Sequence, residues 1–169
     1  MRPRLSTLLI LFALLVAASA YASDTIGDEA AIVLLVNECR AQNDLPPLQE
    51  NSCLKQSSGM KVDDMAGGGY FSHQNSQGEG FWVFVRRAHY QYRSVAEILA
   101  RGGGNERQMV DAWMDSPDHR RAILDPELKD ISCSTRLGGT TYYVACHLGR
   151  PADKPLLPHT FRTAANMSR

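Results

Sequence analysis

Apolar positions spaced three and four residues apart predict helices in the first two thirds of the chain. The first helix is predicted over residues 26–42, and a turn containing two prolines ends it. Asn51 is suited to cap a second helix over 52–66, which a run of three glycines ends. A third helix is predicted over 106–114, and a short fourth one begins at Ser116, where proline follows a good capping residue.

The hydrophobic pattern changes towards the C-terminus. Residues 70–80 are polar and without a period, which predicts a loop, and 81–88 predict a short helix. A strand is predicted over 94–100. Residues 131–136 and 142–148 are rich in β-branched and aromatic side chains on either side of a glycine-containing turn, which predicts a hairpin. Helices first and strands late indicate an α+β domain with helices covering an antiparallel sheet.

The N-terminal segment has the profile of a cleavable signal peptide over residues 1–22. Arg2 and Arg4 precede an apolar run that ends in small residues, and cleavage is expected after Ala20 or Ala22. The rival interpretation is a membrane anchor, but the apolar run is shorter than the roughly 20 residues that a span needs. We therefore expect a secreted protein, extracellular or periplasmic, with no membrane span after cleavage.

The mature chain is expected to be a monomer with one domain over residues 26–149 and a mobile tail over 150–169, because the tail is rich in proline and polar residues without a pattern. The net charge of the whole chain is zero, and it becomes negative when the two arginines of the signal peptide leave. Nucleic acid is therefore not an expected partner, since no excess of positive charge is present to neutralise phosphates.

Four cysteines in an exported chain predict two disulfides. A zinc site made of all four is disfavoured because no two of them form a close Cys-x-x-Cys pair. A two-residue hairpin turn at 139–140 places Cys133 opposite Cys146, so these two are predicted to pair. Cys39 and Cys53 lie on either side of the turn between the first two helices, and a bond between them is predicted as a local staple.

Several short motifs occur together over most of the mature chain, and in this order and spacing they resemble the CAP superfamily. This superfamily, also called the SCP domain, includes cysteine-rich secretory proteins, venom antigen 5 proteins and plant pathogenesis-related proteins, and the resemblance is greatest to its small bacterial members. The matching segments are Asn37-Glu38-x-Arg40, Leu45-Pro46-Pro47-Leu48, Asp64-Met65-Ala66, Phe71-Ser72-His73, Ala88-His89-Tyr90, Glu97, Trp113-Met114-x-Ser116-Pro117-x-His119-Arg120, Ile123-Leu124 and Tyr142-Tyr143-Val144.

The resemblance implies an α-β-α sandwich with a cleft where a pair of histidines and a pair of acids often meet. His73, His119 and Glu97 match cleft positions, and Asp115 is the one candidate for the second acid. Arg120 follows the matched histidine and is a candidate to meet an anionic ligand.

The chain departs from the family pattern at three places in this cleft, and one of them is the second acid, for which only Asp115 is a candidate. Lys61 stands where a histidine is common in the second helix of the family. The family's Gly-Glu-Asn stretch is here Ala96-Glu97-Ile98, so the acid is kept and its neighbours differ.

The residue types of this cleft suit a divalent metal such as zinc. Neutral imidazole is the commonest side-chain ligand of zinc, so His73 and His119 are the candidate metal ligands. Glu97 lies within the apolar run 95–100, where an ionised carboxylate needs a partner. That partner is either one of the two histidines or, in a purely structural role, a backbone amide or Arg101.

Three functions remain open. The first is a non-catalytic module that binds a lipid, glycan or protein ligand, or a metal, at or outside the cell envelope. The second is a zinc-assisted hydrolase in which His73 and His119 hold the metal and Glu97 is the general base. The third is a structural or interaction protein without a small-molecule site. No serine-nucleophile elbow and no His-Glu-x-x-His motif occurs in the sequence, so we place binding first.

Overall fold

The structure is a computed structural model of the chain, and it describes residues 27–153. The predicted signal peptide lies outside the described residues, as does the predicted tail beyond Asp153. Within the described part, no helix is both long and apolar enough to cross a membrane.

Helices and strands alternate along the described part of the chain. Their order is α1 (Glu29–Ala41), β1 (Gln49–Glu50), α2 (Ser52–Gly68), α3 (Trp82–Arg87), β2 (Tyr92–Gly102), α4 (Glu106–Asp115), α5 (Pro117–Ile123), β3 (Asp130–Gly138) and β4 (Thr141–Pro151). The four predicted helices, the short helix after the polar loop and the three longer strands are all present. The two-residue strand β1 was not predicted, and β4 continues two residues into the segment that we expected to be tail.

Side-chain caps explain where the helices begin. The Asn51 side chain accepts hydrogen bonds from the backbone N–H groups of Cys53 and Leu54, as the sequence predicts. Asn105 and Gln108 form a reciprocal capping box at the start of α4. At the other end of α2, Gly69 has a φ of +65°, the left-handed conformation that glycine adopts at no steric cost.

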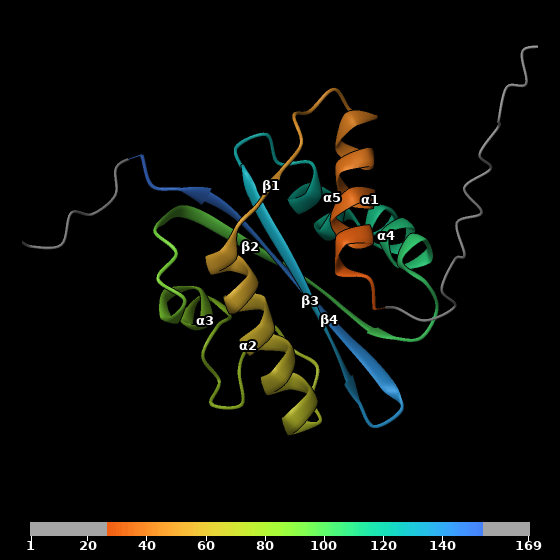
Figure 1. Cartoon of the computed structure of the whole chain (residues 1–169), viewed down its shortest axis with the longest axis vertical. Helices are drawn as coiled ribbons and strands as arrows, with labels where there is room; N and C mark the ends of the chain where they lie inside the picture. The colour runs from red at the N-terminus through yellow and green to blue at the C-terminus, as the bar shows by residue number, and fades with distance from the viewer. Residues whose placement is uncertain (1–26, 154–169) are drawn as a thin grey trace, which may run out of the picture.

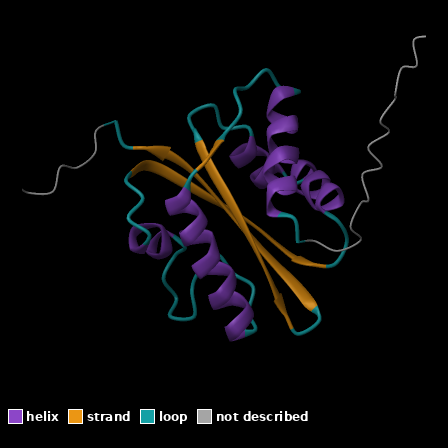
Figure 2. Ribbon diagram, viewed as in Figure 1, coloured by secondary structure: helices purple, strands orange, loops and turns teal. Residues whose placement is uncertain are grey.

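The strands form one sheet in the order β1-β3-β4-β2, with helices on both faces (Figure 1). Strand β4 runs antiparallel to both β3 and β2, and only the short β1 is parallel to its neighbour. Helices α1, α4 and α5 lie on one face, and α2 and α3 lie on the other (Figure 2). The predicted α-β-α sandwich is therefore confirmed.

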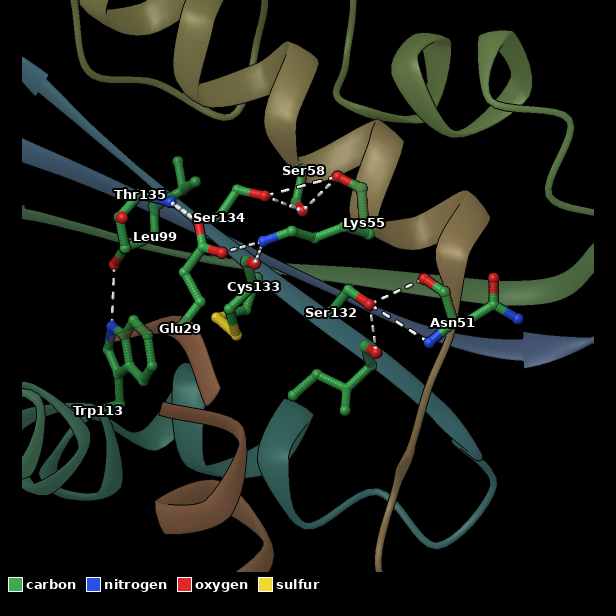
Figure 3. The surroundings of a disulfide bond; sticks show 12 residues. Glu29, Asn51, Lys55, Ser58, Leu99, Trp113, Ser132, Cys133, Ser134 and Thr135 are labelled. Atoms are coloured by element: carbon green, nitrogen blue, oxygen red, sulfur yellow. Dashed lines mark hydrogen bonds and ion pairs between the residues drawn. A yellow bond between two sulfur atoms is a disulfide. The ribbon is translucent and has the colours of Figure 1, made fainter. Parts of the chain in front are cut away.

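The two faces of the sheet differ in chemistry because side chains alternate along each strand. Towards α1, α4 and α5 the strands present apolar side chains such as Ile98, Cys146 and Leu148, which belong to the largest apolar cluster. Towards α2, β3 and β4 also present polar side chains. Ser134 contacts Ser58 of α2 at 2.8 Å between hydroxyl oxygens, and Ser132 accepts a hydrogen bond from the backbone of Asn51 (Figure 3).

The β3–β4 hairpin has the predicted register. Gly138 pairs with Thr141, and the alternation continues until Cys133 pairs with Cys146. These two cysteines form a disulfide with a Cα–Cα distance of 4.0 Å (Figure 3). At the turn, Gly139 has a φ of +65°, which agrees with the predicted first position of a tight hairpin turn.

The predicted bond between Cys39 and Cys53 is wrong, because both thiols are free. Cys39 is buried in the apolar cluster on the α1 face, whereas Cys53 packs beside Leu54 and Tyr90 on the α2 face. The segment between the two helices does not turn back on itself: it pairs with β3 along the edge of the sheet as β1 and crosses from one face to the other. The sheet therefore separates the two sulfur atoms.

Two side chains of α1 hold this crossing segment. The Asn37 amide donates to the Leu48 carbonyl oxygen at 3.0 Å and accepts from the Leu48 backbone N–H at 2.8 Å. The fully buried Arg40 donates to the backbone oxygens of Pro46, Ile123 and Asp125 at 2.8–2.9 Å. Arg40 thus ties the crossing segment and the end of α5 to one helix.

Thiol labelling tests the corrected disulfide pattern. In the folded protein Cys53 should react with an alkylating reagent, whereas Cys39 should react only after unfolding, because it is buried and burial raises its pKa. Peptide mapping without reduction should find Cys133 joined to Cys146. A peptide that joins Cys39 to Cys53 would contradict the separation of the two thiols by the sheet.

Replacing Arg40 by methionine tests the anchoring of the crossing segment. This change leaves three carbonyl oxygens without their donor, which outweighs the relief of burying a charge, and we expect the free energy of unfolding to fall by about 2–3 kcal/mol in urea titrations. Arg107→Met is the matched control: Arg107 is exposed and pairs with Glu38 at the surface, so the midpoint should barely move. Equal midpoints for the wild type and R40M would contradict this role of Arg40.

Candidate functional site

Glu97 is the centre of the candidate site. It lies on β2 with its side chain on the α2 face, and its backbone pairs with His147 of β4. The Glu97 side chain is completely buried. One carboxylate oxygen lies 2.7 Å from Nδ1 of His73, and the other lies 2.9 Å from Nε2 of His147. Two imidazoles therefore satisfy the carboxylate that the sequence places in an apolar strand.

Arg101, the other partner considered for this carboxylate, lies elsewhere. Its guanidinium stands over the ring of Phe71, 5.9 Å from the centroid. The hydrogen bonds of Glu97 thus come from histidines.

His147 and Ser57 are site residues that the sequence analysis missed. Both side chains are fully buried, and the Ser57 hydroxyl lies 2.6 Å from Nδ1 of His147. The signal that singled out Glu97, a polar residue in an otherwise apolar strand, applies equally to His147 within β4. The sequence analysis did not connect His147 with Glu97, because it did not predict that β2 pairs with β4.

His119 approaches the same region from α5. It makes no hydrogen bond with Glu97 among the described residues, but it lies close enough to His73 for the two imidazoles to affect each other. Burial is the main cause that lowers the pKa of His119, and the neighbouring His73 lowers it further. The structure therefore joins His73 of the loop to Glu97 of the strand by a hydrogen bond, and it places His119 of the helix within electrostatic range of His73.

A cleft of about 430 Å³ runs beside His119 along the outer edge of β2. Its lining is mostly apolar, with Arg101, Gln108 and Ser116 as the polar groups besides His119. The apolar lining includes Phe71, Leu99, Ala100, Met109, Ala112 and Trp113. Trp113 also fixes the wall of the cleft, because its indole N–H donates to the Leu99 carbonyl oxygen at 2.9 Å (Figure 3).

Lys61 supports the loop that carries His73. Its side chain is fully buried, and its ammonium group donates to the backbone oxygen of Gln74 at 2.8 Å, next to His73 in the sequence. The same group lies over the rings of Tyr70 and Phe84. Burial lowers the pKa of Lys61, and the nearby Glu97 opposes this shift. Lys61 thus holds the loop against α2 rather than lining the cleft.

Asp115 and Arg120, the two remaining candidates, lie apart from this group. Asp115 is exposed at the end of α4 and is not among the residues that line the cleft. Arg120 is exposed and lines a separate hollow with Pro117 and Leu124. The helical turn that carries His119 presents Arg120 to a different side, because consecutive residues of a helix do not share a face.

The side chains in this region do not form the ligand set of a catalytic zinc site. Among residues 27–153, no group of three or more histidine, cysteine, aspartate or glutamate side chains is arranged to hold a metal ion. Catalytic zinc sites use three protein ligands. Here two imidazoles are available, and both oxygens of Glu97 are already engaged by His73 and His147.

Comparisons with known proteins agree with this architecture. The Bacillus subtilis protein YkwD, which is uncharacterized, is 32% identical over 103 residues, or 61% of this chain and 40% of YkwD. An outer surface protein of Borrelia burgdorferi superposes with a TM-score of 0.68 at 17% identity, over 73% of this chain and 92% of that one.

An extracellular protein of Bacillus anthracis that contains an SCP domain superposes with a TM-score of 0.67 at 18% identity, over 72% of this chain and 40% of that one. At these identities the solved structures show a shared fold. This chain spans less than half the length of YkwD and of the B. anthracis protein.

A family model matches the sequence directly. Residues 33–148, from α1 into β4, match CAP, the cysteine-rich secretory protein family. With this match over most of the described chain and the α-β-α sandwich in place, the protein belongs to the CAP family.

Proposed function

We propose that this protein is a secreted, non-catalytic binding module that acts at or outside the cell envelope. Its binding site is the cleft between the outer edge of β2 and the helices α4 and α5, which His119 lines. The observation that carries this proposal is the cleft itself. It has about 430 Å³ of volume, an apolar lining and a few polar groups at its edge, the usual make-up of a small-molecule site.

The cleft suits an apolar ligand that carries an acidic group. Leu99, Met109 and Trp113 offer apolar surface, and Arg101 and His119 supply positive or hydrogen-bonding groups for the acidic end. Secretion is supported by the signal-peptide profile of the N-terminal segment and by the extracellular and outer surface proteins that share the fold.

The hydrolase alternative has less support. A general base needs a carboxylate that can reach a water molecule in the cleft. The Glu97 side chain is completely buried and holds two imidazoles instead. The alternative of a purely structural protein does not explain why an apolar cleft stays open at the surface.

Weak binding of a divalent cation is a second candidate function, favoured by one observation. His73 lowers the pKa of His119, so the two imidazoles, which come from separate segments, lie within electrostatic range of each other. Imidazole is a common zinc ligand, and two of them in one region are suited at most to weak or transient binding.

Blocking the cleft tests the main proposal. Ala112 lines the cleft from α4, and replacing it by phenylalanine fills part of the volume without changing the core. The probe is 1-anilinonaphthalene-8-sulfonate, an apolar ring system with an acidic group. We expect the folded wild type to enhance its fluorescence, and A112F to bind it about tenfold more weakly, which is ~1.4 kcal/mol.

The matched control is Ala41→Phe, at the exposed end of α1. A41F should bind the probe like the wild type. Equal binding by A112F and the wild type, or an equal loss in A41F, would contradict the assignment of the cleft as the binding site.

Zinc tests the second candidate. Zinc should raise the melting temperature of the wild type by a few degrees near neutral pH, because it binds only the folded site. His73→Ala and His119→Ala should each abolish this shift, and the double variant should add little. The shift should also fade in acid, because imidazole must be neutral to bind a metal, and it should fade only below the ordinary histidine pKa of about 6.5, since burial and His73 lower the pKa of His119.

His89→Asn is the control for a histidine outside the site. His89 is exposed and has a φ of 59°, a conformation that asparagine tolerates. H89N should keep the zinc shift. A shift of the same size in the wild type and in both single alanine variants would show that His73 and His119 hold no zinc.

A further inference from the structure

Four polar side chains form an unbroken chain of hydrogen bonds from the interior to the protein surface. Ser57 of α2 contacts His147 of β4, His147 contacts Glu97 of β2, and Glu97 contacts His73 in the polar loop, at 2.6, 2.9 and 2.7 Å. The first three side chains are buried, whereas the His73 side chain is 59% exposed. The chain therefore begins in the core and ends on a ring that solvent and ligands can reach.

The order of donors along this chain follows from the carboxylate. An ionised carboxylate only accepts hydrogen bonds, so each histidine must donate to it. His147 donates through Nε2–H, which leaves its Nδ1 to accept the hydroxyl proton of Ser57. His73 donates through Nδ1–H. Its Nε2, on the opposite side of the ring, therefore keeps a free lone pair.

Ser57, His147 and Glu97 resemble a catalytic triad in composition, but their placement excludes a nucleophilic role. The Ser57 and His147 side chains have no exposed surface, and neither lines the cleft. A substrate carbonyl has no access to the Ser57 hydroxyl. The role left to these residues is to act on Glu97.

We propose that His147 and Ser57 are positioning residues which, through Glu97, hold His73 in the tautomer that presents the Nε2 lone pair. This role of His147 and Ser57 deepens the proposed function, and it rests on that function only for what His73 binds. Glu97 has three rotatable bonds between its backbone and its carboxylate oxygens, and a contact to His73 alone, on an exposed loop, would leave the carboxylate free to turn. The second contact comes from β4, a central strand of the sheet, and fixes both oxygens.

The groups around His147 are consistent with this role. The Phe81 ring lies 5.3 Å from the His147 ring, centroid to centroid, and restricts its movement. The Ser57 hydroxyl donates to Nδ1 of His147 and so holds the ring with its Nε2–H towards Glu97. A carboxylate in direct contact with a ligating histidine typically changes its affinity for metal 10- to 100-fold, and Glu97, which His147 holds, is that carboxylate for His73.

The first experiment reads the tautomer of His73 directly. The ¹⁵N spectrum of the imidazoles is recorded on the metal-free protein at about pH 8, where an unperturbed imidazole is neutral. The wild type should show His73 as the single Nδ1–H tautomer. His147→Phe keeps an aromatic ring but removes the donor to Glu97, and it should give a mixture of both tautomers.

Two further variants separate positioning from folding. His147→Gln keeps an N–H donor for Glu97 and should restore the single tautomer. Ser57→Ala leaves the Glu97 and His73 side chains unchanged and should still shift His73 towards a mixture of its two tautomers. This variant therefore tests the positioning role even if H147F does not fold. A wild-type His73 in the Nε2–H form, or an unchanged Nδ1–H tautomer in S57A and H147F, would overturn the proposal.

Zinc affinity, measured by calorimetry, is the second readout. We expect H147F to bind zinc at least about tenfold more weakly than the wild type, and H147Q to recover most of that loss. If the wild type binds no zinc, the metal-binding candidate fails, and the tautomer of His73 still decides the role of His147.

Discussion

The pairing of β4 with both of its neighbours is the interaction on which the rest of the structure depends. Its register with β3 places Cys146 opposite Cys133, and its register with β2 places His147 opposite Glu97. Because adjacent side chains of a strand point to opposite faces, the disulfide lies on the apolar face and the buried hydrogen bond between Glu97 and His147 on the polar one. A shift of β4 by one residue would place the His147 imidazole in the apolar core.

Parts of this arrangement were predictable because they are local. The hairpin register follows from a two-residue turn, and counting outward from Gly139 fixes every pair up to Cys133 and Cys146. The cap of α2 is likewise local, because Asn51 accepts hydrogen bonds from residues at most three positions further along the chain. The cleft residues Glu97, His73 and His119 were recognised from motifs of the family, and not from their separations in the sequence.

Other parts were not predictable, because they depend on contacts that are distant in the sequence. His147 meets Glu97 across fifty residues, through the pairing of β2 with β4. The pairing of Cys39 with Cys53 was wrong for a related reason. A short connection between two helices suggested a tight turn, but the sheet edge captures this segment as β1. Local spacing says how near two residues are along the chain, and not on which face of the sheet each one lies.

The hydrogen bond between the Trp113 indole and Leu99 bears on whether copies of this protein associate through their sheet edges. Strand β2 is one edge of the sheet, and an exposed edge offers its backbone groups to a strand of another molecule. At this edge the Trp113 indole of α4 occupies the Leu99 carbonyl oxygen. At the other edge β1 covers only the first two residues of β3, and beyond it Lys55 donates to the Cys133 carbonyl oxygen while Glu29 accepts from the Thr135 N–H (Figure 3). Side chains thus occupy backbone groups at both edges of the sheet, which disfavours edge-to-edge association with a second copy.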